Sequence, residues 1–138
     1  MESEAHRTYV FNIVDYIERK FDIPRNIMAI DDGESLQIPP KNIDGFRADV
    51  YVHTTKFIII GEAKTDNDID NKHTEAQLKS YIKEIKTFSK ERHVILSSSM
   101  MAYPSLRNYI RRLLKSISLH ENITFHTVDP YKKGEILL

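Results

Sequence analysis

The strongest constraint on the fold is a short apolar run, Phe57-Ile58-Ile59-Ile60, which is followed by Gly61 and Glu62. An unbroken run of β-branched and aromatic residues is typical of a strand that is buried on both faces. We therefore predict a buried strand over Phe57–Lys64. The run is far too short to cross a bilayer, which takes about 20 apolar residues.

Helix and strand patterns surround this central strand. Apolar residues at three- and four-residue spacing predict helices over Tyr9–Phe21, His73–Lys90 and Pro104–Ser118. Alternating or apolar stretches predict further strands over Asn26–Ile30, Phe46–His53, His93–Ser98 and Asn122–Val128. This order of elements predicts the α/β class, as a three-layer sandwich with a central mixed β-sheet flanked by helices. The length predicts one domain over residues 1–138.

The composition removes several kinds of active site. No cysteine is present, which excludes disulfides, thiolate zinc sites and a cysteine nucleophile. The six histidines show no paired ligand spacing, and the four glycines form no phosphate-binding loop. The N-terminus is acidic and lacks the apolar segment of a secretion signal. We therefore expect a cytoplasmic protein that does not bind membranes.

Carboxylates on two neighbouring strands are the remaining candidates for chemistry. Asp49 lies in the Phe46–His53 stretch, and Glu62 and Lys64 end the central strand. Because side chains alternate along a strand, Glu62 and Lys64 point to the same face. A hairpin around residues 53–56 would bring Asp49 close to Glu62. Two adjacent carboxylates repel each other unless a cation joins them, and oxygen ligands favour Mg²⁺ or Mn²⁺. A lysine beside them would orient a water or balance charge on a phosphate.

A simpler explanation of these charges stays open. Glu-x-Lys also occurs at Glu18–Lys20 and Glu84–Lys86, on predicted helices, where solvated charges explain it best. Only Glu62 follows an apolar strand and has an aspartate on the strand before it. The alternative is a surface ion pair between Glu62 and Lys64, with Asp49 unrelated to either.

Gln77 and Tyr81 lie four residues apart on the next predicted helix, so they share one of its faces. Structural explanations compete with a role in a site for both residues. Thr74-Glu75-Ala76-Gln77 matches a capping box, in which Gln77 would bond back to the start of the helix. Tyr81 fits the apolar stripe of the helix and is expected in the core.

Together, Ala48-Asp49, Glu62-Ala63-Lys64 and Gln77-x-x-x-Tyr81 resemble motifs of the PD-(D/E)xK nuclease superfamily. The last of these is similar to the helix motif of RecB-like nucleases, and Holliday junction resolvases are another similar branch. The resemblance extends from about Phe46 to Tyr81. It implies a restriction endonuclease-like core that hydrolyses phosphodiester bonds.

The resemblance also implies a role for each matching residue. Asp49, Glu62 and the carbonyl of Ala63 would bind Mg²⁺ or Mn²⁺. Lys64 would position or activate the attacking water, and Gln77 would support the site.

The chain departs from the family pattern at two points. Ala48 stands where the family frequently has a proline. The acid that the family carries on its first helix has two competing counterparts, Glu4 and Glu18, and the apolar stripe of that helix favours neither.

Charge is unevenly distributed along the chain. Residues 1–70 carry 8 Lys and Arg against 14 Asp and Glu, whereas residues 71–120 carry 10 against 3. The basic residues are either the solvated faces of two helices or a surface that binds a phosphate backbone. The second explanation predicts nucleic-acid contacts from Lys79, Lys83, Lys86, Arg107, Arg111 and Arg112.

These features predict a divalent-metal-dependent nuclease, acting as a DNA endonuclease with structure-dependent or weak sequence specificity. A homodimer would allow symmetric cutting of two strands, and a partner protein would supply targeting. The alternative is a catalytically silent nuclease-fold module that binds nucleic acid or a protein partner. Whether the substrate is DNA or RNA, and whether the biological role is repair or restriction, stays open.

Overall fold

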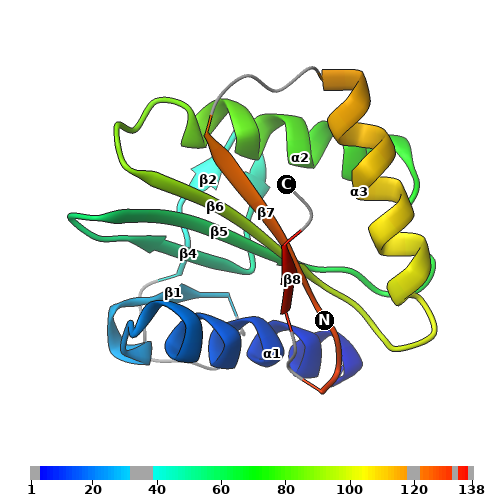
Figure 1. Cartoon of the computed structure of the whole chain (residues 1–138), viewed down its shortest axis with the longest axis horizontal. Coiled ribbons are helices and arrows are strands. Elements are labelled where there is room, and N and C mark those ends of the chain that lie inside the picture. The colour runs from blue at the N-terminus through cyan, green and yellow to red at the C-terminus, as the bar shows by residue number, and fades with distance from the viewer. Residues whose placement is uncertain (1–3, 32–38, 118–121, 132–133, 137–138) are drawn as a thin grey trace.

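The computed structural model describes residues 4–31, 39–117, 122–131 and 134–136 of the chain. Its centre is a six-stranded sheet with the strand order β1-β4-β5-β6-β7-β8 (Figure 1). These strands are β1 (Ala29–Ile30), β4 (Val50–His53), β5 (Phe57–Ala63), β6 (Glu91–Ser97), β7 (Ile123–Val128) and β8 (Gly134–Ile136). Two short strands, β2 (Asn42–Ile43) and β3 (Phe46–Arg47), form a separate hairpin.

Three helices cover the two faces of the sheet and complete three layers. α1 (Glu4–Phe21) lies on one face, whereas α2 (Lys72–Ile85) and α3 (Tyr103–Ile117) lie on the other (Figure 1). β5, β6 and β7 run parallel, because α2 and α3 carry the chain back between them. The pairs β1–β4, β4–β5 and β7–β8 are antiparallel. The predicted α/β class with a mixed sheet between helices is therefore confirmed.

β5 separates two apolar cores. Ile58 and Ile60 pack in the core under α2 and α3, whereas Ile59 packs in the core under α1. All three side chains are fully buried, which confirms the prediction of a strand covered on both faces. Gly61 allows α1 to lie close to β5, since a Cβ at this position would be 2.8 Å from Cγ2 of Ile13.

The predicted strand over Phe46–His53 is divided in two. Asp44 and Gly45 have φ angles of 53° and 86°, which produce a tight turn between β2 and β3. This hairpin is separate from the main sheet, and the chain pairs with β5 only from Val50 onward. Asp49 therefore lies just before β4 instead of inside a longer strand.

Other elements differ from prediction at their ends. Asn26–Ile30 is a 3₁₀ turn, η1 (Arg25–Ile27), followed by the short strand β1. α2 ends at Ile85, with Lys86 as its C-cap. The N–H of Lys86 still bonds four residues back, to Ile82, whereas those of Thr87 and Phe88 bond only three residues back. α1 begins earlier than predicted and β8 was not predicted, while Ser118 lies outside the described residues. In the part of the chain that the structure describes, no helix combines the length and apolar character of a membrane span.

Candidate metal centre

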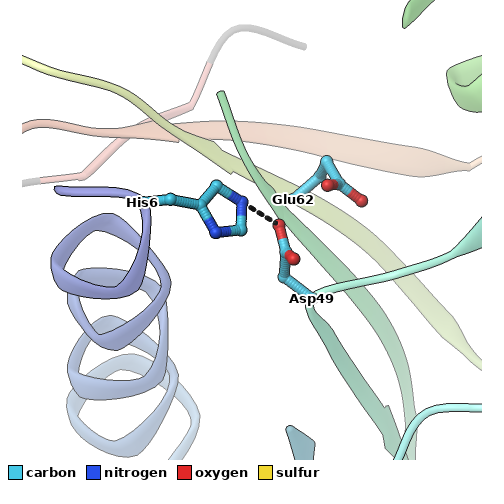
Figure 2. A group of neighbouring side chains, drawn as sticks. All are labelled: His6, Asp49 and Glu62. Atoms are coloured by element: carbon cyan, nitrogen blue, oxygen red, sulfur yellow. Dashed lines mark ion pairs between the residues drawn. The ribbon is translucent and has the colours of Figure 1, made fainter. Parts of the chain in front are cut away.

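The candidate site lies at the carboxyl end of β5, where the start of β4 and the first turn of α1 meet it. The β4–β5 hairpin pairs Val50 with Gly61, so Asp49 and Glu62, the next residues outward, lie across from each other. His6 reaches the same point from α1 (Figure 2). One nitrogen of His6 and one oxygen of each carboxylate all lie within 4.8 Å of one another. The hairpin thus brings together the two acids that the sequence pattern placed on neighbouring strands.

Asp49 is fixed by contacts to its backbone and its side chain. The N–H of Ala63 donates to Oδ2 of Asp49 at 2.8 Å, and Nε2 of His6 lies 3.3 Å from the same oxygen. The N–H of Asp31 donates to the backbone carbonyl of Asp49 at 2.9 Å. Asp49 is only 6% exposed, so its carboxylate is held toward Glu62 instead of turning into solvent.

Glu62 is buried beside a second negative charge. Burial raises the pKa of the Glu62 carboxyl well above its usual value, and the charge of Asp49 raises this pKa further. The charge of Lys64 opposes the rise, as does the hydroxyl of Tyr81, which donates to Oε1 of Glu62 at 2.9 Å. Burial and the neighbouring acid outweigh these two groups, so the net effect disfavours the charged form of Glu62. A divalent cation between the carboxylates would favour the charged form.

Lys64 and Gln77 form a buried pair beside Glu62. Nζ of Lys64 donates to Oε1 of Gln77 at 2.5 Å, and the two residues are 3% and 6% exposed. The cap of α2 is Asn71, whose side chain accepts from the N–H of Thr74 at 2.8 Å. The capping-box explanation of Gln77 is therefore wrong. A surface ion pair between Glu62 and Lys64 is also wrong, because both residues are buried.

His6 is the residue of the first helix that reaches the cluster, and neither predicted acid belongs to it. Glu18 lies in the last turns of α1, where it pairs with Arg25 at 2.8 Å, and Glu4 is exposed in the first turn. The sequence holds a signal for His6, since it precedes the buried Val10 by four residues and continues the buried stripe of α1. Predicting the start of the helix at Tyr9 left this signal out.

Most of the basic residues predicted to contact nucleic acid line two different clefts. A cleft of about 320 Å³ between α2 and the last turn of α3 is lined by three of them, Lys79, Lys83 and Lys86. A second cleft, of about 730 Å³, lies between α3 and the loop after β5 and is lined by Arg111 and Arg112. The guanidinium of Arg107 lies 5.8 Å from the centre of the Tyr103 ring.

Two of these basic side chains are partly neutralised. Nζ of Lys79 lies 2.7 Å from the carboxylate of Glu75, and Arg112 lies 2.9 Å from that of Asp70. The solvated-helix explanation therefore holds for part of the basic stretch.

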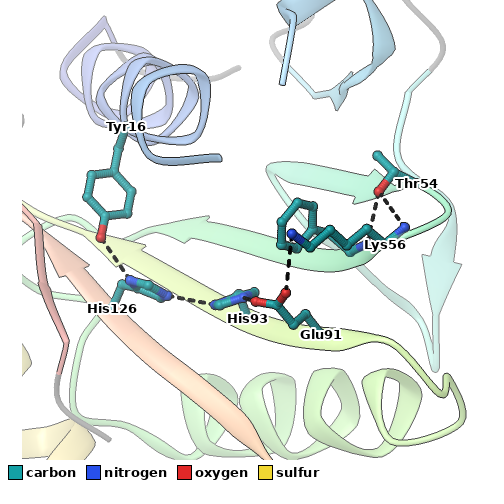
Figure 3. Close-up of polar contacts among 7 residues, drawn as sticks. Tyr16, Thr54, Lys56, Glu91, His93 and His126 are labelled. Atoms are coloured by element: carbon teal, nitrogen blue, oxygen red, sulfur yellow. Dashed lines mark hydrogen bonds and ion pairs between the residues drawn. The ribbon is translucent and has the colours of Figure 1, made fainter. Parts of the chain in front are cut away.

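A second buried polar cluster, which we call the histidine chain, lies between α1 and the sheet (Figure 3). Nδ1 of His93 is 2.9 Å from Nε2 of His126, whose Nδ1 is 2.8 Å from the hydroxyl of Tyr16. Nε2 of His93 is 3.3 Å from the carboxylate of Glu91. Burial lowers the pKa of both histidines, to about 3 for His126.

One set of tautomers satisfies the whole histidine chain when both rings are neutral. Glu91 only accepts, so His93 must donate from Nε2 and accept at Nδ1. His126 then donates from Nε2 to His93 and accepts at Nδ1 from the hydroxyl of Tyr16. The hydroxyl of Tyr16 and all four ring nitrogens therefore have a partner within the protein, and the chain ends at the exposed carboxylate of Glu91.

No family model, curated protein or solved structure matches this chain in comparisons with known proteins. The likeness to PD-(D/E)xK nucleases therefore depends on the motif residues between Phe46 and Tyr81 and on the geometry around them. That geometry brings two acids, an imidazole and a buried lysine together at the carboxyl end of β5.

Proposed function

We propose that this chain is a divalent-metal-dependent nuclease with a restriction endonuclease-like core. The observation that carries the proposal is the convergence of His6, Asp49 and Glu62 within 4.8 Å, beside the buried pair of Lys64 and Gln77. A phosphodiester is an anion, so it approaches two carboxylates only if a cation lies between them. Acids that bind a cation, with a lysine at their side, are therefore suited to phosphodiester hydrolysis.

The donor set fits Mg²⁺ or Mn²⁺. Asp49 and Glu62 offer carboxylate oxygens, and the family likeness adds the carbonyl of Ala63. Nε2 of His6 adds a nitrogen, a donor that Mn²⁺ accepts more readily than Mg²⁺ does. The bound metal would supply Lewis-acid polarisation of the phosphate and a water of lowered pKa.

Lys64 would act on the water and the phosphate. Its ammonium would hold the oxygen of the attacking water and stabilise negative charge that develops on the phosphoryl oxygens. Gln77 is a positioning residue, because its amide oxygen holds Nζ of Lys64. Tyr81 positions Glu62 in the same way through its hydroxyl.

DNA as substrate, cleavage within the strand and a homodimer complete the proposal. Basic residues of α2 and α3 would contact phosphates, and such contacts position a substrate without reading its sequence. Weak sequence specificity follows from this. Two copies related by a twofold axis would cut both strands of a symmetric substrate.

Cleavage of a labelled panel with Mg²⁺ or Mn²⁺ tests the proposal. The panel contains single-stranded, duplex, flap and four-way-junction DNA, together with RNA. Lys64→Ala is expected to lower the rate by about 100-fold or more, because it removes a charge beside the reacting phosphate. Lys56→Ala is the matched control, since Lys56 lies at the other end of β5 with its side chain 70% exposed.

The outcomes are distinct. Metal-dependent cutting that Lys64→Ala abolishes and Lys56→Ala retains would support the nuclease. Cutting that survives Lys64→Ala would contradict the proposed site. Salt-sensitive binding without cutting by any variant would favour the catalytically silent module.

A further inference from the structure

Three exposed apolar side chains follow the carboxyl ends of the parallel strands, the same end of the sheet that carries the candidate metal centre. Met100 and Met101 follow β6 and are 45% and 88% exposed, and Tyr131 follows β7 and is 76% exposed. β5, β6 and β7 are parallel, so their carboxyl ends all lie at this end of the sheet. The other large exposed apolar residue among those described, Ile27, lies beyond the end of α1. We call Met100, Met101 and Tyr131 the apolar rim.

The apolar rim and the candidate metal centre lie at the same end of the parallel strands. Ala63, Ser97 and Val128 form one row across the three parallel strands. Neighbouring strands are about 4.8 Å apart, so this row spans roughly 10 Å. The rim residues follow the row by only three or four positions along the chain. In Figure 1 the loop after β6 and the end of β7 lie on the side where α1 begins.

The methionines are exposed on a loop that is fixed. Oγ of Ser99 donates to the carboxylate of Asp66 at 2.6 Å and accepts from the N–H of Ala102 at 3.1 Å. The N–H of Lys64 donates to the carbonyl of Ser97 at 2.9 Å, at the start of the same loop. The loop is thus tied to the chain that leaves the metal centre.

We propose that the apolar rim binds unpaired bases of the substrate strand, and that the substrate is therefore single-stranded or branched DNA. The inference rests on the proposed function, because a phosphate at the metal centre would place the neighbouring nucleotides at the rim. In a duplex the faces of the bases are covered by stacking, whereas unpaired bases present them. Tyr131 offers a ring for stacking, and the methionine thioethers contact aromatic rings favourably.

The adjoining cleft between α3 and the loop after β5 complements the rim. Asn108 and Arg111 line this cleft and offer donors to a phosphate backbone, while Asp70, which also lines it, is paired with Arg112. Asp66 lines it too and bonds to Ser99, so the cleft adjoins the methionine loop. A strand would lay its bases on the rim and its phosphates along α3, the combination that single-strand-binding proteins use.

Binding measurements test the rim separately from cleavage. The probes are a fluorescein-labelled single-stranded oligonucleotide and a blunt duplex of the same sequence, measured by anisotropy with Ca²⁺. The protein is the full chain with Lys64→Ala, with and without Met101→Ser plus Tyr131→Ser. The rim substitutions are expected to weaken single-strand binding by about tenfold, the effect of losing a stacked base, and to leave duplex binding unchanged. Ile27→Ser is the control for losing an exposed apolar side chain elsewhere.

The rim proposal and the nuclease proposal fail separately. The rim proposal would be wrong if the rim substitutions left single-strand binding unchanged, or weakened binding of single strand and duplex equally. If the wild-type chain cut duplex with metal and the rim substitutions did not affect this cutting, the rim proposal would be wrong and the nuclease proposal would stand. If single-strand binding depended on the rim but the chain cut nothing, the rim proposal would stand and the nuclease proposal would be wrong.

Discussion

The histidine chain and the candidate metal centre are two polar clusters beside the same sheet, and they differ in how well their donors, acceptors and charges match. In the histidine chain, Tyr16, His126 and His93 each donate once, and Glu91 accepts the last hydrogen bond. At the candidate metal centre, two carboxyl groups share a few donors, and burial together with the charge of Asp49 raises the pKa of the Glu62 carboxyl, so both acids can be charged only at a cost in stability.

This difference is the one expected between a structural cluster and a cluster that binds a cation. A buried network whose donors and acceptors all match adds stability and has no need of a ligand. A cluster with surplus negative charge costs stability when it is empty, and the same surplus is what binds a cation. Substitutions should therefore have opposite consequences in the two places.

The largest effect is expected from Asp49→Asn. Asparagine keeps the oxygen that accepts from Ala63 and removes one of the two negative charges. Without metal, the Tm should be equal to or higher than that of the wild type. Metal at 100 times Kd should stabilise the wild type by about 2.7 kcal/mol, and this gain should disappear in the variant.

Thermal unfolding in EDTA and with Mn²⁺ measures both quantities. Asp44→Asn is the matched control, because Asp44 is exposed in the β2–β3 turn and Asn tolerates its positive φ. If Mn²⁺ stabilised Asp49→Asn as much as the wild type, the cluster would not be a metal centre.

The histidine chain should make the protein less stable in mild acid. The pKa of His126 is about 3 in the fold, against 6.5 for an ordinary histidine, so the folded state resists protonation. The stability from neutral His126 is complete above pH 6.5 and is lost as the pH falls from 6.5 toward 3. By pH 4.5 the loss should be on the order of 2–3 kcal/mol.

Urea unfolding at pH 7 and pH 4.5 checks this expectation, with His126→Gln as the comparison. The variant should be less stable at pH 7, because the hydroxyl of Tyr16 and Nδ1 of His93 lose their partner. It should also lose less stability between the two pH values. Equal losses in wild type and variant would show that His126 does not control the acid sensitivity.

His6→Ala should distinguish the two metals. The imidazole contributes more to binding a transition ion than to binding Mg²⁺, so Mn²⁺ affinity should fall by about tenfold and Mg²⁺ affinity by less. Calorimetric titration of each metal measures the two ratios. His73→Ala, at an exposed position of α2, should leave both affinities unchanged. An equal loss for both ions would mean that His6 acts on Asp49 and not on the metal.

The parts that could be predicted from the sequence depend on short-range periodicity. Alternation along strands put Glu62 and Lys64 on one face, and the hairpin put Asp49 opposite Glu62. The apolar run predicted the burial of β5 for the same reason. None of these inferences depends on which helices pack on the sheet.

The parts that could not be predicted depend on contacts between distant elements. His93 and His126 are 33 residues apart and meet only through the parallel register of β6 and β7, which their own sequences do not specify. Periodicity put Tyr81 in the core but did not show that its hydroxyl would bond to Glu62. His6 differs from these residues, because it continues the buried stripe of α1 and is left out only when the helix is predicted to begin at Tyr9.

The smallest effect should come from removing one hydroxyl from each cluster. Tyr16→Phe and Tyr81→Phe keep the ring and delete a buried donor, to His126 and to Glu62 respectively. Without metal each should cost about 1 kcal/mol in the free energy of unfolding. Saturating Mn²⁺ should reduce the cost of Tyr81→Phe, because the cation replaces the lost partner of Glu62. The cost of Tyr16→Phe should not change, since the histidine chain has no place for a ligand. Urea unfolding of both variants, with and without Mn²⁺, measures the four free energies of unfolding. If Mn²⁺ changed the cost of both substitutions equally, the two clusters would not differ in their ability to bind a cation.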